Sequence, residues 1–228
     1  ISIIWKFLRF IVYRFAEKII VNKPNIKKIF FHKKFFFIPN PIVLNSTKKK
    51  IKKEKIILSV ARLNYQKNLD FLIYCFSKSL AVKREWKLVI IGIGDEKKKL
   101  VQLAKNLNIS NLVIFKNTVK KIDTWYKKAE IFILPSRFEG MPNSLIEAMN
   151  YKVPVIGTDI PGINFFIKNN YNGLLFKINE KNKLIKYINL LVNDKNLREF
   201  LGNNAYKKVN ILSNPKIFLD SWLNILNK

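Results

Sequence analysis

From residue 55 onward, short unbroken apolar runs alternate with longer segments of helical periodicity. Strands of a parallel sheet read as such runs, because helices cover both faces of the sheet. The alternation therefore predicts an α/β protein with a parallel sheet and right-handed crossovers. The expected strands span residues 55–60, 87–91, 112–115, 131–134, 153–156 and 173–176. The expected helices span residues 69–80, 96–107, 122–128, 144–150, 182–192, 195–209 and 215–227.

The usual strand order of a doubly wound, Rossmann-like sheet is 3-2-1-4-5-6, and it locates a candidate site. It places the strands at 55–60 and 131–134 side by side, with a crevice at their carboxyl ends. The loops that follow these strands, 61–67 and 135–143, then border the same crevice.

The first residues form a separate feature. Residues 1–15 are apolar but contain Lys6, Arg9 and Arg14, so the segment is too short and too charged to span a bilayer. Helical spacing predicts a basic amphipathic helix, which either lies on a membrane surface or is the last helix of a truncated domain. The chain opens inside this segment with Ile1 rather than Met, so we expect a fragment that lacks an N-terminal portion.

Short strands are expected at 18–21 and 35–38, the second running into a turn at 39–41 that contains two prolines. The lysine-rich residues 48–53 read as a solvated linker. We place a domain boundary between about residues 42 and 54 on this composition.

The net charge of +28 raises the question of nucleic-acid binding. The lysines are spread along the whole chain, and no nucleic-acid-binding motif is present, so attraction to anionic membranes or anionic substrates is the favoured interpretation.

Cys75 is the only cysteine and lies in an apolar run, which predicts a buried thiol and fits a reducing cytoplasm. His32 is the only histidine, which excludes a site built from several histidines.

The loop after the fourth strand carries Glu139, and Glu147 follows eight residues later in the next helix. A helix N-terminus attracts phosphate, and carboxylates accept hydrogen bonds from sugar hydroxyls, so the pair suggests a nucleotide-sugar site. Gly140 permits close approach of the backbone, and Pro142 makes the turn rigid. Ser144 and Glu147 also fit a capping box, so Glu147 is either a cap or a ligand.

Arg62 and Lys67 lie five residues apart at the mouth of the first strand. A planar guanidinium and a point charge both suit a diphosphate, with roughly 1.5–3 kcal/mol per charge-assisted bond. The alternative is that both cations are ordinary surface residues.

These motifs resemble the C-terminal nucleotide-sugar domain of glycosyltransferase family 4, whose members are retaining enzymes with two Rossmann domains (the GT-B fold). Glu139 and Glu147 match the family's Glu-x7-Glu pattern, and Arg62 and Lys67 match its Arg-Leu…Gln-Lys segment. The resemblance also covers the Gly-x-Gly turn at 92–94 and the segments 157–162 and 172–176, and it extends over nearly all of residues 10–228.

The resemblance implies roles for individual residues. Arg62 and Lys67 hold the diphosphate and stabilise the leaving group, Glu139 contacts hydroxyls of the donor sugar and acts with both cations in catalysis, and Glu147 binds the ribose. Phe115 lies near the base. The implied donor-binding residues are Arg62, Lys67, Gly92, Gly94, Phe115, Glu139, Gly140, Met141, Pro142, Asn143, Ser144, Leu145 and Glu147. Three glycines of the family are replaced by Ala61, Asn68 and Asn117, which puts the base contacts in doubt.

By this resemblance the chain belongs to an enzyme that moves a sugar from a nucleotide diphosphate, by family habit UDP, to a glycan or lipid-linked acceptor in cell-surface glycan synthesis. Residues 1–47 are then the end of the acceptor-binding domain, 48–212 the donor domain, and 213–228 a helix that crosses back to the N-terminal domain. The fragment alone is expected to be inactive.

No cofactor is expected. Because the chain has no Asp-x-Asp, a metal-bridged diphosphate is not expected either. The expected location is cytoplasmic, with peripheral contact to an anionic membrane and no nucleic-acid partner. A nucleotide-sugar 2-epimerase of the same fold and a non-catalytic basic membrane-surface or nucleic-acid-binding module are the alternatives.

Overall fold

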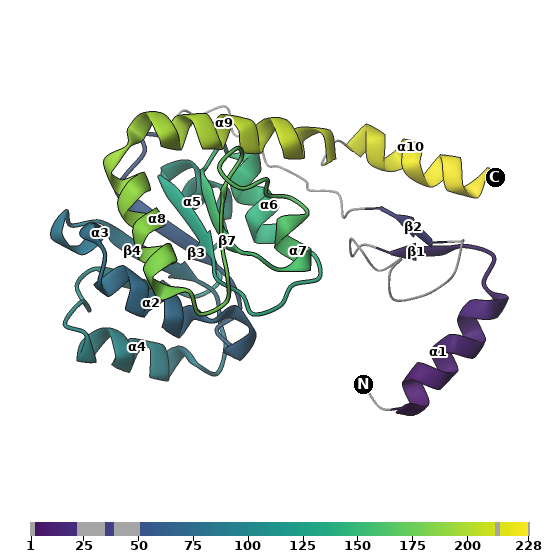
Figure 1. Cartoon of the computed structure of the whole chain (residues 1–228), viewed down its shortest axis with the longest axis horizontal. Helices are drawn as coiled ribbons and strands as arrows, with labels where there is room; N and C mark the ends of the chain where they lie inside the picture. The colour runs from purple at the N-terminus through teal and green to yellow at the C-terminus, as the bar shows by residue number, and fades with distance from the viewer. Residues whose placement is uncertain (1–2, 22–34, 39–50, 213–214, 228) are drawn as a thin grey trace.

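The computed structural model of the chain describes residues 3–21, 35–38, 51–212 and 215–227 (Figure 1). Its centre is a parallel sheet of six strands in the order β5-β4-β3-β6-β7-β8, which confirms the predicted 3-2-1-4-5-6 order. The strands are β3 (Ile56–Val60), β4 (Lys87–Ile91), β5 (Val113–Lys116), β6 (Ile131–Leu134), β7 (Val155–Thr158) and β8 (Leu174–Phe176).

Helices cover both faces of the sheet, as the apolar strands require. The helices are α2 (Leu69–Ser77), α3 (Leu80–Lys83), α4 (Lys97–Asn106), α5 (Ile122–Lys128), α6 (Asn143–Asn150), α7 (Pro161–Asn164), α8 (Lys181–Asn193) and α9 (Lys195–Leu212). Ile57 packs on one face with α2, α3, α4 and α8, whereas Leu58 packs on the other face with α5, α6, α7 and α9. Cys75 is a free, buried thiol in the first of these clusters, as predicted.

Several elements differ from the sequence prediction. The helix expected at 69–80 is split, because Ser79 adopts an extended backbone (φ −93°, ψ 163°) and its Oγ donates to Phe76 O (2.7 Å). The strand expected to begin at residue 153 begins at Val155. The short helix α7 and a 3-10 turn, η2 (Tyr65–Lys67), had no counterpart among the expected elements.

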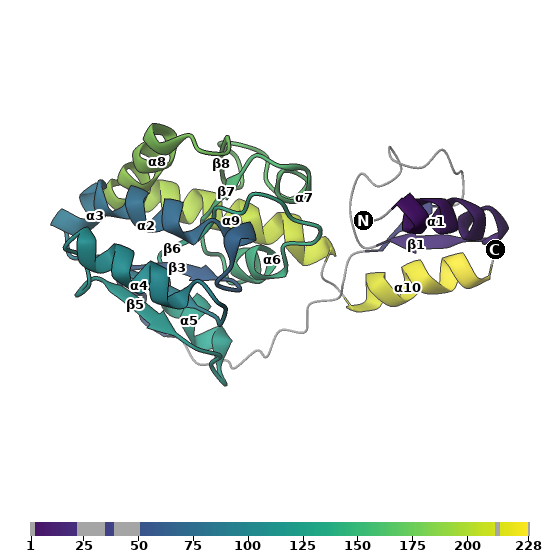
Figure 2. The same ribbon diagram turned by 90° about the horizontal axis from the view of Figure 1, so that it is seen from below.

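The N-terminal segment contains helix α1 (Ile3–Phe15), at the predicted place, and a separate parallel pair, β1 (Ile19–Val21) and β2 (Phe35–Phe37). Helix α10 (Pro215–Leu226) lies beside this segment, where Lys18 Nζ donates to Ile225 O (2.6 Å) (Figure 2). Of the described helices, none has the length and apolar character needed to cross a membrane. The turn at 39–41, His32 and residues 48–50 of the lysine-rich linker lie outside the described residues.

Candidate functional site

The loops after β3 and β6, which were predicted to border one crevice, are hydrogen-bonded to each other. Arg137 N donates to Gln66 O (2.8 Å), and Gln66 Nε2 donates to Phe138 O (2.9 Å). The Arg137 guanidinium also lies over the Tyr65 ring, 4.2 Å from its centroid. These contacts fix the first loop against the second at the carboxyl ends of adjacent strands.

Glu139 lies at the centre of this junction. Its Oε1 accepts hydrogen bonds from Lys67 Nζ (2.6 Å) and Ser136 Oγ (2.7 Å), and its side chain is only 5% exposed. A carboxylate this buried is stable only when it is paired and hydrogen-bonded. Within the described part of the chain, Oε2 has no such partner, so one oxygen is fixed while the other can accept a hydrogen bond from a hydroxyl.

Ser136 and Gly162 support Glu139 and were missed by the sequence reasoning. Ser136 is fully buried two residues after the end of β6, and a short hydroxyl so close to the apolar run is the only local signal for it. A Cβ atom on Gly162 would lie 2.5 Å from Glu139 O, so only glycine lets α7 approach the backbone of Glu139. A Cβ atom on Gly140 would meet nothing within 4 Å.

Glu147 projects from α6, and its Oε2 accepts a hydrogen bond from the Tyr126 hydroxyl (2.7 Å). Burial raises the pKa of the Glu147 carboxyl, and the Tyr126 hydrogen bond partly offsets this effect. The Tyr126 ring is itself stacked on Tyr151, with 5.6 Å between ring centroids. Tyr126 comes from α5, and no local sequence pattern pointed to this contact.

The capping box predicted from Ser144 and Glu147 is wrong. Helix α6 begins at Asn143 with Pro142 as its N-cap, so Ser144 lies inside the first turn, and no side chain caps the helix. The carboxylate of Glu147 is held by Tyr126 instead, which removes the cap as an explanation for this residue.

The backbone N–H groups of the predicted donor-binding residues 141–145 are partly occupied. Asn143 N donates to Met141 O and Leu145 N to Pro142 O, both at 3.0 Å, and Pro142 itself has no N–H. Among the described residues, none accepts a hydrogen bond from the N–H of Met141 or Ser144. These two donors at the N-terminus of α6 are therefore available to an anion.

Gly92 and Gly94 let the loop after β4 pack against the loop after β3. Their φ angles are +154° and +156°, and a Cβ atom would lie 1.9 Å from Ala61 O at Gly92 and 2.3 Å from Leu63 O at Gly94. Leu63 N donates to Ile93 O (2.8 Å) across this contact. Their place in donor binding stays a prediction, but their backbone role is clear.

Arg62 and Phe115 are not among the hydrogen-bond or ion-pair partners of Glu139. Arg62 is exposed on the loop after β3 and forms no ion pair with the described residues. Phe115 is half-buried on β5, the edge strand, which two strands separate from β6. Asn68, which replaces a family glycine, has φ +54°, a left-handed conformation that Asn tolerates better than other non-glycine residues.

Within the described residues, no group of three or more His, Cys, Asp or Glu side chains could hold a metal ion.

Residues 44–208 match the protein family described as glycosyl transferases group 1, which is most of the chain, so the chain belongs to this family. The six-stranded parallel sheet and its strand order agree with the Rossmann-like domains of GT-B enzymes.

The chain is similar to several known glycosyltransferases. It is 33% identical to an "Uncharacterized glycosyltransferase" of Haemophilus influenzae over 70% of this chain and 46% of the relative. It is 30% identical to the "GalNAc-alpha-(1->4)-GalNAc-alpha-(1->3)-diNAcBac-PP-undecaprenol alpha-1,4-N-acetyl-D-galactosaminyltransferase" of Campylobacter jejuni over 98% of this chain and 63% of the relative. The crystal structure of an S. aureus TarM mutant with fondaparinux, α-GlcNAc-glycerol and UDP superposes with a TM-score of 0.83 at 27% identity, covering 92% of this chain and 44% of TarM. The chain therefore spans about half to two thirds of the length of these relatives.

Proposed function

We propose that the chain is the donor-binding part of an enzyme that transfers a sugar from a UDP-sugar to a glycan or lipid-linked acceptor, with retention of the anomeric configuration. The observation that carries the proposal is the buried Glu139 held by Lys67 and Ser136, next to the open N-terminus of α6. A cation, a carboxylate with a free oxygen and open N–H groups match the three parts of a sugar diphosphate.

The leaving group is a nucleoside diphosphate, and its developing negative charge has to be stabilised. Lys67 is mostly buried beside Glu139, and the exposed Arg62 lies on the same loop, so we expect both cations to reach the diphosphate. The N–H groups of Met141 and Ser144 add neutral donors to the same region. Electrostatic stabilisation by preorganised groups of this kind is usually the largest single contribution to such catalysis.

The two carboxylates receive hydrogen bonds from hydroxyls of the donor. Glu139 Oε2 accepts a hydrogen bond from a hydroxyl of the sugar, and Glu147 accepts one from the ribose.

The TarM complex contains UDP, which favours uracil as the base for this chain as well. The name of the Campylobacter relative contains PP-undecaprenol, which supports a lipid-linked acceptor and peripheral contact with the cytoplasmic face of a membrane. We expect neither a metal nor another cofactor.

Calorimetric titration of the chain with UDP, ADP and GDP tests the donor site. We expect saturable binding of UDP that falls at least about tenfold in Arg62→Ala/Lys67→Ala, because each charge-assisted bond contributes roughly 1.5–3 kcal/mol. The control is Lys78→Ala/Lys186→Ala, which removes the same charge from exposed positions away from the crevice, at the end of α2 and on α8.

The two variants separate a specific site from general attraction. Equal losses of affinity in both variants would mean that the net charge of +28 alone attracts the nucleotide. Preference for ADP or GDP would overturn the choice of UDP, and the absence of nucleotide binding in a folded sample would overturn the donor site in this chain.

A further inference from the structure

A second pocket, outside the crevice, lies between the loop that follows α7 and helix α9. Its volume is about 610 Å³, within the range of sites for small ligands. The lining residues come from both elements: Asn164, Phe165, Phe166, Ile167, Lys168, Tyr171, Asn172, Asn204, Lys207 and Lys208.

The pocket is cationic. Lys168, Lys207 and Lys208 line it, and among its described lining residues none is acidic. Lys168 Nζ is 5.5 Å from the centroid of the Tyr171 ring, and Lys208 Nζ is 5.9 Å from that of Phe165. Cation–π contacts of this kind hold the ammonium groups over the rings. One carboxylate, that of Asp159, is bonded to a lining residue, since it accepts a hydrogen bond from Asn164 Nδ2 (2.9 Å).

Buried amides fix the wall of the pocket. Asn172 is 2% exposed; its Oδ1 accepts from Lys168 N (2.6 Å) and its Nδ2 donates to Phe166 O (2.9 Å). Asn204 on α9 is 7% exposed and donates from Nδ2 to Tyr171 O (3.0 Å). The loop is thus tied both to itself and to α9, so the pocket is formed before any ligand arrives.

The pocket adjoins the crevice through α7. Gly162 of this short helix touches the backbone of Glu139, and Asn164, two residues further on, lines the pocket. A helix advances about 1.5 Å per residue, so Gly162 and Asn164 lie within one turn of α7.

We propose that this pocket binds a phosphate-bearing sugar residue of the glycan acceptor. Lysine ammonium groups suit phosphate, the aromatic rings of Tyr171 and Phe165 give the wall an apolar surface beside them, and Asn204 Oδ1 can accept a hydrogen bond from a sugar hydroxyl. The assignment of the ring to an acceptor rests on the proposed transferase function, whereas the anionic character of the ligand rests on the pocket alone.

Amide NMR of the isotope-labelled 228-residue chain, saturated with UDP to occupy the donor site, tests the proposal. The probes are glucose 6-phosphate, glucose and inorganic phosphate. We expect saturable shifts at residues 164–172 and 204–208 with glucose 6-phosphate, and much weaker ones with either glucose or phosphate alone.

A triple variant supplies the second measurement. Lys168→Gln/Lys207→Gln/Lys208→Gln is expected to weaken glucose 6-phosphate binding at least about tenfold while leaving UDP affinity unchanged. The matched control is Lys181→Gln/Lys183→Gln/Lys186→Gln on α8, where two lysines also lie over tyrosine rings. It is expected to bind the probe like the unmodified chain.

Three results would overturn the proposal: no shifts at the pocket, equal affinity for inorganic phosphate and glucose 6-phosphate, or equal losses in the two triple variants. A chain that fails to bind UDP contradicts the donor site. A chain that binds UDP but shows no shifts at residues 164–172 contradicts only the second pocket.

Discussion

At the scale of single residues, the two carboxylates of the crevice have different partners. Glu139 is paired with the ammonium group of Lys67, whereas Glu147 accepts a hydrogen bond from the neutral hydroxyl of Tyr126. Burial raises the pKa of Glu147 above its usual range, and the Tyr126 hydrogen bond offsets only part of this effect. Folding therefore disfavours the ionised form of Glu147. The stability of the protein should then depend on pH in the range where this carboxyl ionises.

Substitution Glu147→Gln tests this link between pH and stability. The folded chain binds the Glu147 proton more tightly than the unfolded chain does, so the stability that this proton contributes is present at low pH and lost as pH rises through the folded pKa. Glutamine has no proton to lose and still offers an oxygen to Tyr126. We expect the melting temperature of the variant, relative to the unmodified chain, to rise between about pH 4 and about pH 7.

The control for this experiment is Glu199→Gln on α9. Glu199 is 62% exposed and forms only a loose surface ion pair with Lys195 (3.7 Å). Its melting-temperature difference should stay nearly constant over the same pH range, because exposed pairs contribute little. If the difference for Glu147→Gln is equally constant over this pH range, burial does not raise the pKa of the Glu147 carboxyl. Weaker UDP binding by Glu147→Gln, measured separately, would support its contact with ribose.

At the scale of elements, α7 positions the loop that carries Glu139. Gly162→Ala would place a Cβ atom 2.5 Å from Glu139 O, so either α7 or the Glu139 backbone must move. We expect a loss of about 1–3 kcal/mol in stability, typical of overpacking, together with weaker UDP binding. Chemical denaturation and calorimetry measure the two effects.

The matched control is Gly140→Ala, directly after Glu139 in the same loop but with no atom within 4 Å of its added Cβ. Its stability should change by no more than about 0.5 kcal/mol. Equal stabilities of the two alanine variants would show that the close approach at Gly162 does not constrain the loop.

The sheet was predictable because each strand is an apolar run and the crossovers have one hand. That regularity is enough to place Lys67 and Glu139 at one crevice, although 72 positions of sequence separate them. The N-terminus of α6 was not predictable, because the same residues fit a helix beginning at Asn143 as well as one capped by Ser144. Only the observed start of the helix decides between them.

The residues that support the site could not be predicted from the sequence for a different reason. Tyr126 reaches Glu147 only because α5 and α6 pack on the same face of the sheet, which no local pattern encodes. Gly162 follows β7, and it allows close contact with the backbone of Glu139, which lies in the loop after β6. Asn68 counted as a departure from the family, yet its left-handed backbone keeps the conformation that a glycine would supply.

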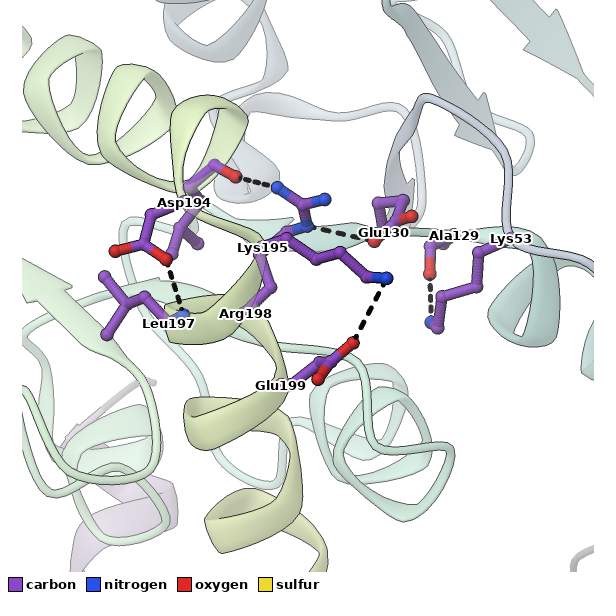
Figure 3. Close-up of polar contacts among 9 residues, drawn as sticks. Lys53, Ala129, Glu130, Asp194, Lys195, Leu197, Arg198 and Glu199 are labelled. Carbon is purple, nitrogen blue, oxygen red and sulfur yellow. Dashed lines mark hydrogen bonds and ion pairs between the residues drawn. The ribbon is translucent and has the colours of Figure 1, made fainter.

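At the scale of the whole molecule, α9 is fastened to the amino-terminal edge of the sheet (Figure 3). Arg198 donates from Nε to Glu130 Oε2 (2.9 Å) and from Nη1 to Leu191 O (2.5 Å), and its guanidinium lies 5.5 Å from the centroid of the Trp86 ring. Glu130 precedes β6 directly, whereas the crevice follows the carboxyl end of that strand. Nearby, Lys53 donates to Ala129 O (2.5 Å), and burial lowers the pKa of its ammonium group.

Substitution Arg198→Met separates stability from donor binding. Its side chain is 10% exposed and that of Glu130 20%, so the change leaves a mostly buried carboxylate without its closest cation and should destabilise the fold by about 2–4 kcal/mol. Because Arg198 lies at the opposite end of β6 from Glu139, UDP affinity below the melting transition should stay unchanged. Urea denaturation and calorimetry test the two halves of this prediction.

The control for Arg198→Met is Lys195→Gln, one turn away on α9. It removes an ammonium group that is 74% exposed and should change stability by less than about 0.5 kcal/mol. A variant Arg198→Met as stable as Lys195→Gln would show that α9 is held by apolar packing alone. A loss of UDP affinity in Arg198→Met that is absent from the control would show that the two edges of the sheet are coupled through β6.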